Sequence, residues 1–327
     1  MNVLGLSFYY HDSAAALLKD GVLVAAAAEE RFSRKKHDSG FPELAIDFCL
    51  KTGGITIHDV DYVVFYEKPF VKFERMLLTA MATFPKSANV FRESMQRWIS
   101  DKLWIKSMMA RRLDLPRAKV LFADHHVSHA ASSFFPSPFE ESAILTVDGA
   151  GEWTTSTMAV GRGNKIEVIK EMRFPHSLGL LYSAFTAYCG FEINEGEYKL
   201  MGMHPYGEPK YCDEIYKILE VAEDGSVWHD MRYFQYHYST NDTLSPLFEK
   251  HFGRPRRDPK EQDKSLDPFF CDMAASIQRC TEEILMKMIS HLHEITGMKN
   301  LCLAGGVALN SVANYKLMRG GPFDDVY

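Results

Sequence analysis

The sequence lacks the features that mark secreted and membrane proteins. None of its six cysteines belongs to a Cys-x-x-Cys pair, which argues against a zinc knuckle or a disulfide framework and favours reduced thiols in a cytosolic core. No apolar run reaches the ~18 residues needed to span a bilayer. The N-terminal residues show neither the basic region nor the cleavage site of a signal peptide. We therefore expect a cytoplasmic protein with no membrane partner.

Basic charge and the common nucleotide-binding loops are also lacking. With 37 Lys and Arg against 43 Asp and Glu, the net charge is -6, which argues against a nucleic-acid partner. The sequence contains neither Gly-x-Gly-x-x-Gly nor Gly-x-x-x-x-Gly-Lys, so a nucleotide would need another kind of contact. The 327 residues, 46% hydrophobic and 24% charged, are typical of a globular protein with two domains or lobes.

One strand and turn plan occurs twice along the chain. Apolar runs at 3–7, 14–18 and 22–28 predict three strands, with Asp12 in the first turn and Asp20-Gly21 as a hairpin. Runs at 143–147, 154–160 and 165–172 repeat the plan, with Asp148 in the first turn. We predict an α/β fold of two related lobes that face each other across a cleft. The lobes are residues 1–136, with a helical insertion at about 70–113, and residues 137–327, with a loop-rich peripheral insertion at about 222–268.

Further elements are predicted in the second lobe. Helices are expected over 177–189, with Ser177 as the N-cap, over 268–296, and over 307–319. A strand at 301–304 leads into Gly305 and Gly306, and a helix N-terminus after such glycines favours a nucleotide contact. The last residues, 324–327, read as the start of another strand, so we expect a truncated sequence.

Two histidines provide the clearest candidate site. His125 and His129 follow a short strand at 119–122, and residues four apart on a helix lie on one face. Two imidazoles and carboxylates from elsewhere would form a divalent metal site. His126 stands where the protease motif His-Glu-x-x-His has its glutamate, so protease chemistry is not indicated. The alternative is that both histidines are surface or helix-cap residues.

Two charged segments have two readings each. Residues 29–37 are either a solvated loop or a segment whose Lys36 reaches a phosphate. Residues 194–207, with Lys199, are either a loop that lines a site or a plain surface turn. The turn at Asp148 and Gly149 offers backbone N–H groups that suit phosphate oxygens.

Together, six ordered motifs resemble the NodU/CmcH-type O-carbamoyltransferase family. They lie at residues 4–15, 29–37, 125–130, 147–149, 197–202 and 305–310. The resemblance implies a duplicated actin/sugar-kinase/chaperone-ATPase fold, whose lobes each contain a mixed sheet begun by a three-stranded meander. It implies an N-terminal domain similar to threonylcarbamoyl-transfer enzymes. The family's YrdC-like domain, and a further family aspartate, are absent from this sequence.

The resemblance also implies a reaction and its metal ligands, and the other site residues named below are candidates that suit this chemistry. A carbamoyl group passes from carbamoyl adenylate, made from carbamoyl phosphate and ATP, to a hydroxyl of a small metabolite, often a sugar or antibiotic. An iron(II)-type metal is implied at His125, His129 and Asp148. Catalysis is assigned to His11, His125 and His129, although His11 reads almost equally well as a turn-stabilising side chain. Contacts to nucleotide or carbamoyl adenylate are assigned to Asp12, Lys36, Gly149, Lys199, Gly305, Gly306 and Asn310.

Two other functions remain open at this point. One is a small-molecule kinase or ATPase of the same fold, which would need no histidine pair. The other is a non-catalytic nucleotide-binding fragment that depends on a partner for its missing half. The sequence identifies neither the hydroxyl acceptor nor the oligomeric state, and a homo-oligomer stays open.

Overall fold

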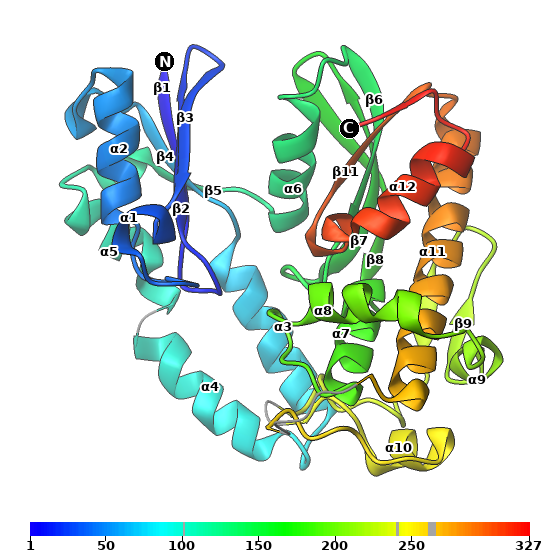
Figure 1. The fold of residues 1–327 in the computed structure, drawn as a ribbon. Coiled ribbons are helices and arrows are strands. Elements are labelled where there is room, and N and C mark those ends of the chain that lie inside the picture. Colours follow the sequence, from blue (N-terminus) through cyan, green and yellow to red (C-terminus); the bar gives the residue numbers. More distant parts are fainter. Residues whose placement is uncertain (101, 240–241, 261–265) are drawn as a thin grey trace. The chain divides into compact units, whose positions relative to one another are not determined.

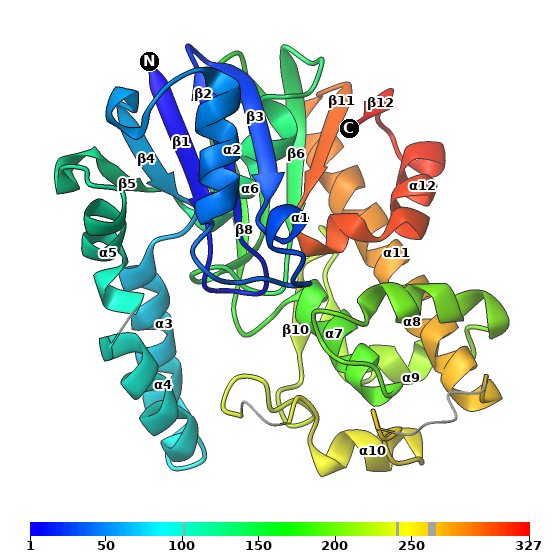
Figure 2. The same ribbon diagram turned by 60° about the vertical axis from the view of Figure 1, so that its left-hand side comes forward.

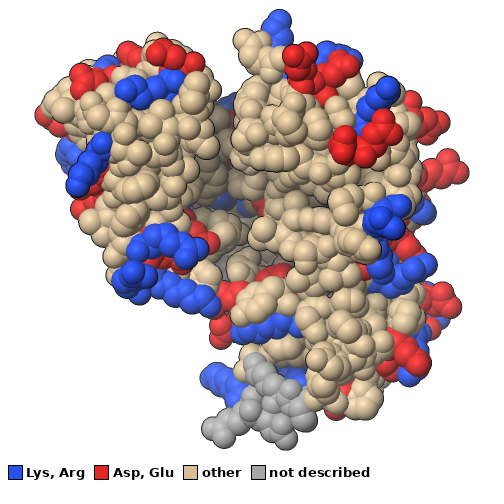
Figure 3. All heavy atoms as spheres, turned by 45° about the horizontal axis from the view of Figure 1, so that its top comes forward, with Lys and Arg blue, Asp and Glu red and all other residues tan. Residues whose placement is uncertain are grey.

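The computed structural model describes residues 1–100, 102–239, 242–260 and 266–327 (Figure 1). The chain divides into two compact units. Unit 1 contains Met1–Met76 and Arg92–Ser128, and unit 2 contains Leu77–Phe91 and His129–Tyr327. No helix in the described ranges combines the length and apolar character that crossing a membrane requires. On the face in Figure 3, acidic and basic side chains are interspersed among uncharged residues.

Unit 1 contains a five-stranded sheet in the order β3-β2-β1-β4-β5. Strands β1, β2 and β3 form an antiparallel meander, and β4 and β5 run parallel to β1. Asp20 and Gly21, with φ values of 50° and 84°, form the tight β2–β3 turn that their sequence predicts. The strands are β1 (Asn2–Ser7), β2 (Ala14–Lys19), β3 (Val22–Ala28), β4 (Tyr62–Phe65) and β5 (Val120–Phe122).

Unit 2 repeats this sheet, with the order β12-β11-β6-β7-β8. The meander β6-β7-β8 is antiparallel, and β11 and β12 run parallel to β6. Read from its other edge, as β8-β7-β6-β11-β12, this sheet has the same order and the same strand directions as that of unit 1. The predicted duplicated α/β fold with two mixed sheets is therefore confirmed. The strands are β6 (Glu141–Val147), β7 (Thr154–Arg162), β8 (Lys165–Arg173), β11 (Asn300–Ala304) and β12 (Asp325–Val326).

Helices and short elements complete the two units. The α-helices are α1 (Glu30–Ser33), α2 (Glu43–Gly53), α3 (Pro69–Ala82), α4 (Ala88–Ser100), α5 (Ile105–Arg112), α6 (His125–Phe134), α7 (Leu178–Tyr188), α8 (Glu197–Met203), α9 (Cys212–Tyr216), α10 (Pro246–Phe252), α11 (Pro268–Thr296) and α12 (Ser311–Gly320). The 3-10 helices are η1 (Ile57–Asp59), η2 (Lys102–Trp104), η3 (Arg117–Lys119), η4 (His204–Tyr206) and η5 (Gly306–Leu309). A small hairpin contains β9 (Leu219–Val221) and β10 (Val227–His229).

The sheet of unit 2 is covered by helices on both faces (Figures 1 and 2). Successive residues of a strand point to opposite faces. Leu145 and Val147 of β6 therefore join the large core beneath α7 and α11, whereas Ile144 packs with Phe134 of α6. Gly161 makes room for this second layer, because a Cβ atom there would lie 2.6 Å from the Phe134 ring. This packing holds α6 next to the end of β6.

Several expected loops are more ordered than the sequence predicts. Residues 197–203 form helix α8 rather than a loop, and the expected helix at 307–319 is divided at Asn310 into η5 and α12. The segment at 222–268 is not only peripheral, because its Phe234 and Phe248 are fully buried in the core. Residues 240–241 and 261–265 of that segment, and residue 101 of the expected helical insertion, lie outside the described residues.

The segment at 29–37 also differs from a plain solvated loop. Glu29 is 5% exposed, and its carboxylate accepts hydrogen bonds from the backbone N–H groups of Leu44 (3.1 Å) and Ala45 (2.7 Å). These N–H groups belong to the first turn of α2, where a carboxylate is stabilised by the helix dipole. Helix α1 follows directly, and Lys36 is exposed beyond it.

Candidate metal and nucleotide site

Helix α6 carries the histidine pair. It begins at His125, three residues after β5 ends at Phe122, and His129 follows one turn later. The spacing of four residues places both histidines on one face of this helix. His125 is 7% exposed, and the His129 side chain is 30% exposed. The predicted helical presentation of the two imidazoles therefore holds.

Asp148 lies where strand β6 ends, close to His129. Its Oδ2 atom is 3.3 Å from the His129 Nε2 atom. One ligand atom each from His125, His129 and Asp148 lie within 4.8 Å of one another. The structure thus brings together the three side chains for which the sequence predicts a metal.

The donor set suits a transition metal. Two imidazoles and one carboxylate are the donor types that typically hold non-haem iron(II), and similar sets also hold zinc. The His125 Nδ1 atom is 4.0 Å from Glu67 Oε2, and Lys72 donates to that same oxygen at 2.6 Å. A carboxylate behind a ligating imidazole fixes the ring orientation and raises its basicity. The residues present therefore fit a bound divalent ion.

The turn after β6 is held by the start of α7. The Ser177 hydroxyl is directed toward the carbonyl oxygens of Asp148 (2.9 Å) and Gly149 (2.7 Å), and its oxygen accepts the Leu180 N–H (3.0 Å). Ser177 is thus the predicted N-cap. A Cβ atom on Gly179 would lie 2.5 Å from the Asp148 carbonyl oxygen, so only glycine allows this approach.

The Gly305-Gly306 turn meets Asp148 from the other side. Gly305 has a φ of 93°, and a Cβ atom there would lie 2.3 Å from the Val147 carbonyl oxygen. The Gly306 N–H donates to Asp148 Oδ1 at 3.2 Å. Gly305 is thus needed for close packing against the end of β6. The Asp148 carboxylate therefore contacts both His129 and the Gly305-Gly306 turn.

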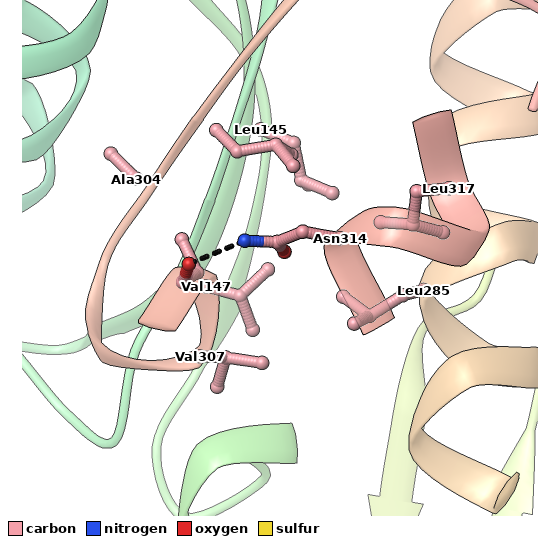
Figure 4. A pocket seen from close by; sticks show the side chains of 9 residues that line it. Leu145, Val147, Leu285, Ala304, Val307, Asn314 and Leu317 are labelled. Carbon is pink, nitrogen blue, oxygen red and sulfur yellow. Dashed lines mark hydrogen bonds between the residues drawn. The ribbon is translucent and has the colours of Figure 1, made fainter. Parts of the chain in front are cut away.

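A small apolar cavity lies beside this turn (Figure 4). Its volume is about 10 Å³, which is room for at most one water molecule and far too small for a nucleotide. Asn314 donates to the Ala308 carbonyl oxygen at 2.6 Å and closes η5 against α12. The cavity is lined by Leu145, Val147, Leu285, Leu303, Ala304, Val307, Ala308, Asn314 and Leu317.

Two other predicted nucleotide contacts have different surroundings. Asn310 is 8% exposed, and its amide caps α12 and bonds to Gln278. Lys199 is exposed on α8, and its Nζ atom lies 5.7 Å from the centre of the Tyr198 ring. Both side chains therefore lack a described contact with the Asp148 turn.

In unit 1, His11 and Asp12 lie in the first turn of the meander. His11 Nδ1 contacts one oxygen of Asp12, and His37 Nδ1 lies 3.2 Å from the other. Partial burial opposes ionisation of Asp12, but the hydrogen bonds from His11 and His37 outweigh it and lower the pKa of the carboxyl group. The His11 side chain is 50% exposed.

Sequence reasoning missed the surroundings of Asp12. Asp12, Glu30 and His37 place one ligand atom each within 4.8 Å of one another. The His37 N–H also donates to Glu30 Oε2 at 3.2 Å. The charged run at 29–37 contained this signal, but only the fold of the meander brings Asp12 to it.

Residues 2–327 match a protein family described as carbamoyltransferase N-terminus. The chain belongs to this family. Among the curated relatives of this carbamoyltransferase N-terminus, uncharacterized protein sll1178 of Synechocystis is 50% identical over 337 residues, which cover 100% of this chain and 54% of the relative. Nodulation protein NolNO of Sinorhizobium fredii is 33% identical over 326 residues, 98% of this chain and 44% of the relative. The chain thus spans about half the length of these relatives.

Solved structures that match this carbamoyltransferase N-terminus have low sequence identity to it. The crystal structure of T. kodakarensis HypF is 12% identical, with a TM-score of 0.45, and the match covers 99% of this chain and 44% of that one.

Proposed function

We propose that this chain carries the transfer site of an O-carbamoyltransferase. The carbamoyl group would come from carbamoyl adenylate, made from carbamoyl phosphate and ATP, and would pass to a hydroxyl of a small metabolite such as a sugar or an antibiotic. Membership of the carbamoyltransferase family supports the reaction class. The observation that carries the proposal is Asp148, which contacts His129 through one carboxylate oxygen and the Gly306 turn through the other.

The proposed metal is iron(II), held by His125, His129 and Asp148. When bound, it would supply Lewis-acid polarisation of phosphoryl and carbonyl oxygens. Glu67 would keep the His125 ring in the orientation needed for ligation, since its carboxylate lies behind the Nδ1 atom. Lys72 balances the charge of this buried carboxylate.

The remaining residues are proposed to bind and to move a proton. In unit 2, the N–H of Gly149 and the turn at Gly305 and Gly306 would accommodate phosphate and adenosine, because these glycines place no side chain in the way. The exposed cations Lys36 and Lys199 would neutralise phosphate charge.

In unit 1, the His11–Asp12 pair is proposed to act on the acceptor. Asp12 fixes the His11 ring through Nδ1, which leaves Nε2 as the atom that accepts the proton of the acceptor hydroxyl. The oxygen of that hydroxyl would then form the new bond to the carbamoyl carbon, while the bond from that carbon to AMP breaks.

Metal analysis tests the site. Wild-type protein and the double variant His125→Ala/His129→Ala are loaded with iron(II) under anaerobic conditions, and the metal per chain is measured after desalting. We expect the double variant to lose the ion. His126→Asn is the matched control, because His126 is a buried imidazole of the same helix and is not in the donor group. Unchanged metal content in the double variant would show that the site assignment is wrong.

Product analysis tests the reaction. The chain is mixed with the remaining part of a full-length relative, carbamoyl phosphate, ATP and a panel of hydroxyl metabolites, and the products are analysed by mass spectrometry. Carbamoylated acceptor and AMP support the proposal. A phosphorylated acceptor would instead support a small-molecule kinase of the same fold.

A further inference from the structure

Gln278 lies at the centre of a buried polar network in unit 2. It belongs to α11, is 1% exposed, and has hydrogen bonds to three other side chains. Its Oε1 atom accepts from the Tyr182 hydroxyl at 3.0 Å and from Asn310 Nδ2 at 2.8 Å. Its Nε2 atom donates to Asn310 Oδ1 at 3.1 Å and to Glu282 Oε1 at 2.9 Å. All four hydrogen-bonding positions of this amide are therefore used.

The direction of each hydrogen bond follows from the backbone. The Ala313 N–H donates to Asn310 Oδ1 at 3.0 Å, which makes that atom the oxygen and leaves Nδ2 as the donor. The reciprocal pair then fixes the orientation of the Gln278 amide. Burial raises the pKa of Tyr182, so its hydroxyl stays protonated and donates.

This network joins α7 and α12, each of which is connected to the Asp148 turn near its N-terminus. Tyr182 is on α7, whose N-cap Ser177 contacts the Asp148 carbonyl oxygen. Asn310 is the N-cap of α12, which follows the Gly305-Gly306 turn. At the other end, Asp148 and Gly306 are joined directly. These contacts form a closed ring that runs from Asp148 through α7 to Gln278, and from Gln278 through Asn310 back to Gly306. The Asp148–Gly306 hydrogen bond closes the ring at one end, and Gln278 closes it at the other.

We infer that Gln278 is a positioning residue for the glycine turn that meets Asp148, and that it tunes nucleotide binding without touching the nucleotide. This inference rests on the proposed function for its nucleotide part. A buried amide pair is costly to break, because each group left behind loses its partner without regaining water. The position of the Gly305–Asn310 segment therefore depends on Gln278.

The ion pair behind the network supports the same role. Lys316 of α12 donates to Glu282 Oε2 at 2.5 Å, and Glu282 is 5% exposed. Glu282 therefore provides a second connection between Gln278 and α12, through Lys316, which lies six residues after Asn310. Rotation of α12 away from α11 would break both connections.

The test compares Gln278→Leu with Thr281→Val. Thr281 is fully buried on the same helix, and its hydroxyl donates only within α11, to Ile277 O at 2.8 Å among its described contacts. The first readout is amide hydrogen exchange of residues 305–314 in protein without ligand. We expect roughly tenfold faster exchange in Gln278→Leu and little change in Thr281→Val. Equal exchange in both variants would overturn the positioning role, whether or not the chain binds nucleotide.

The second readout is affinity for ADP, measured by calorimetry on the same proteins. We expect roughly tenfold weaker binding by Gln278→Leu with the heat of unfolding retained. Tyr182→Phe removes one hydrogen bond and should give a smaller change in the same direction, which keeps the test valid if Gln278→Leu folds poorly. Faster exchange with unchanged ADP affinity would refute the tuning of binding. Failure of the wild type to bind ADP would refute the proposed function, and the exchange result would still decide the positioning role.

Discussion

Asp148 and Gly306 are 158 residues apart in the chain, yet the Gly306 N–H donates to the Asp148 carboxylate at 3.2 Å. The other oxygen of Asp148 lies 3.3 Å from His129. One side chain therefore connects the proposed metal ligands to the turn proposed to receive the nucleotide. Its two oxygens have different partners, so their roles are separable by substitution.

Substitutions of Asp148 should separate metal binding from the glycine turn. Asp148→Asn keeps an oxygen that can accept the Gly306 N–H but loses the negative charge, so we expect loss of iron(II) with ADP affinity nearly retained in metal-free protein. Asp148→Ala removes both interactions, and we expect ADP affinity to fall roughly fivefold to tenfold as well. Metal analysis and calorimetry provide the measurements. Equal ADP affinity in metal-free wild type and Asp148→Ala would contradict this division of roles.

Glu67 should influence metal affinity without being a ligand. Glu67→Gln weakens the electrostatic support of the His125 ring, and changes behind a metal ligand typically reduce affinity by roughly tenfold to a hundredfold. Competition with a chelator measures the change. Glu74→Gln is the matched control, because Glu74 is an exposed glutamate on α3, the helix that begins two residues after Glu67. The same affinity in both variants would mean that Glu67 only balances Lys72.

Much of the architecture follows from local sequence, but the polar contacts of the site do not. Alternating apolar runs and the Asp20-Gly21 turn indicate both meanders, and the four-residue spacing places His125 and His129 on one helix face. The Asn310 interaction was not predicted, because its partner Gln278 lies 32 residues earlier on a helix that reads only as an amphipathic stripe. One interpretation of the sequence placed Glu29 in a solvated loop. In the structure its carboxylate is buried and accepts hydrogen bonds from N–H groups of α2. Such pairings depend on tertiary packing, which periodicity does not encode.

Stability should fall in mild acid because of a buried histidine. Burial lowers the pKa of His229 to about 3, and its Nδ1 atom is 2.6 Å from the Tyr236 hydroxyl. The unfolded chain binds a proton near pH 6.5, whereas the folded chain resists protonation down to about pH 3. The contribution of His229 is therefore complete above pH 6.5 and is lost progressively below it, by at most ~1.4 kcal/mol per pH unit.

Urea unfolding at pH 7 and pH 5 measures this loss. We expect His229→Gln to start from a lower free energy of unfolding at pH 7 and to lose less of it at pH 5 than the wild type. His58→Gln, at an exposed position, should follow the wild type. Parallel pH curves for wild type and His229→Gln would contradict the assignment.

Gly179 should be intolerant of even one methyl group, because it packs on the turn that holds Asp148. In Gly179→Ala the new Cβ atom would lie 2.5 Å from the Asp148 carbonyl oxygen and 2.8 Å from the Gly149 nitrogen, both of them backbone atoms that cannot rotate away. We expect a loss of ~1–3 kcal/mol in the free energy of unfolding, as for other overpacked positions. Displacement of the turn should also reduce iron(II) binding in the protein that remains folded. Gly320→Ala is the matched control, since its Cβ atom would meet only the Met286 methyl group, at 3.6 Å. If both alanine variants unfold at the wild-type urea concentration and retain the metal, the contact of Gly179 with the Asp148 turn does not constrain that turn.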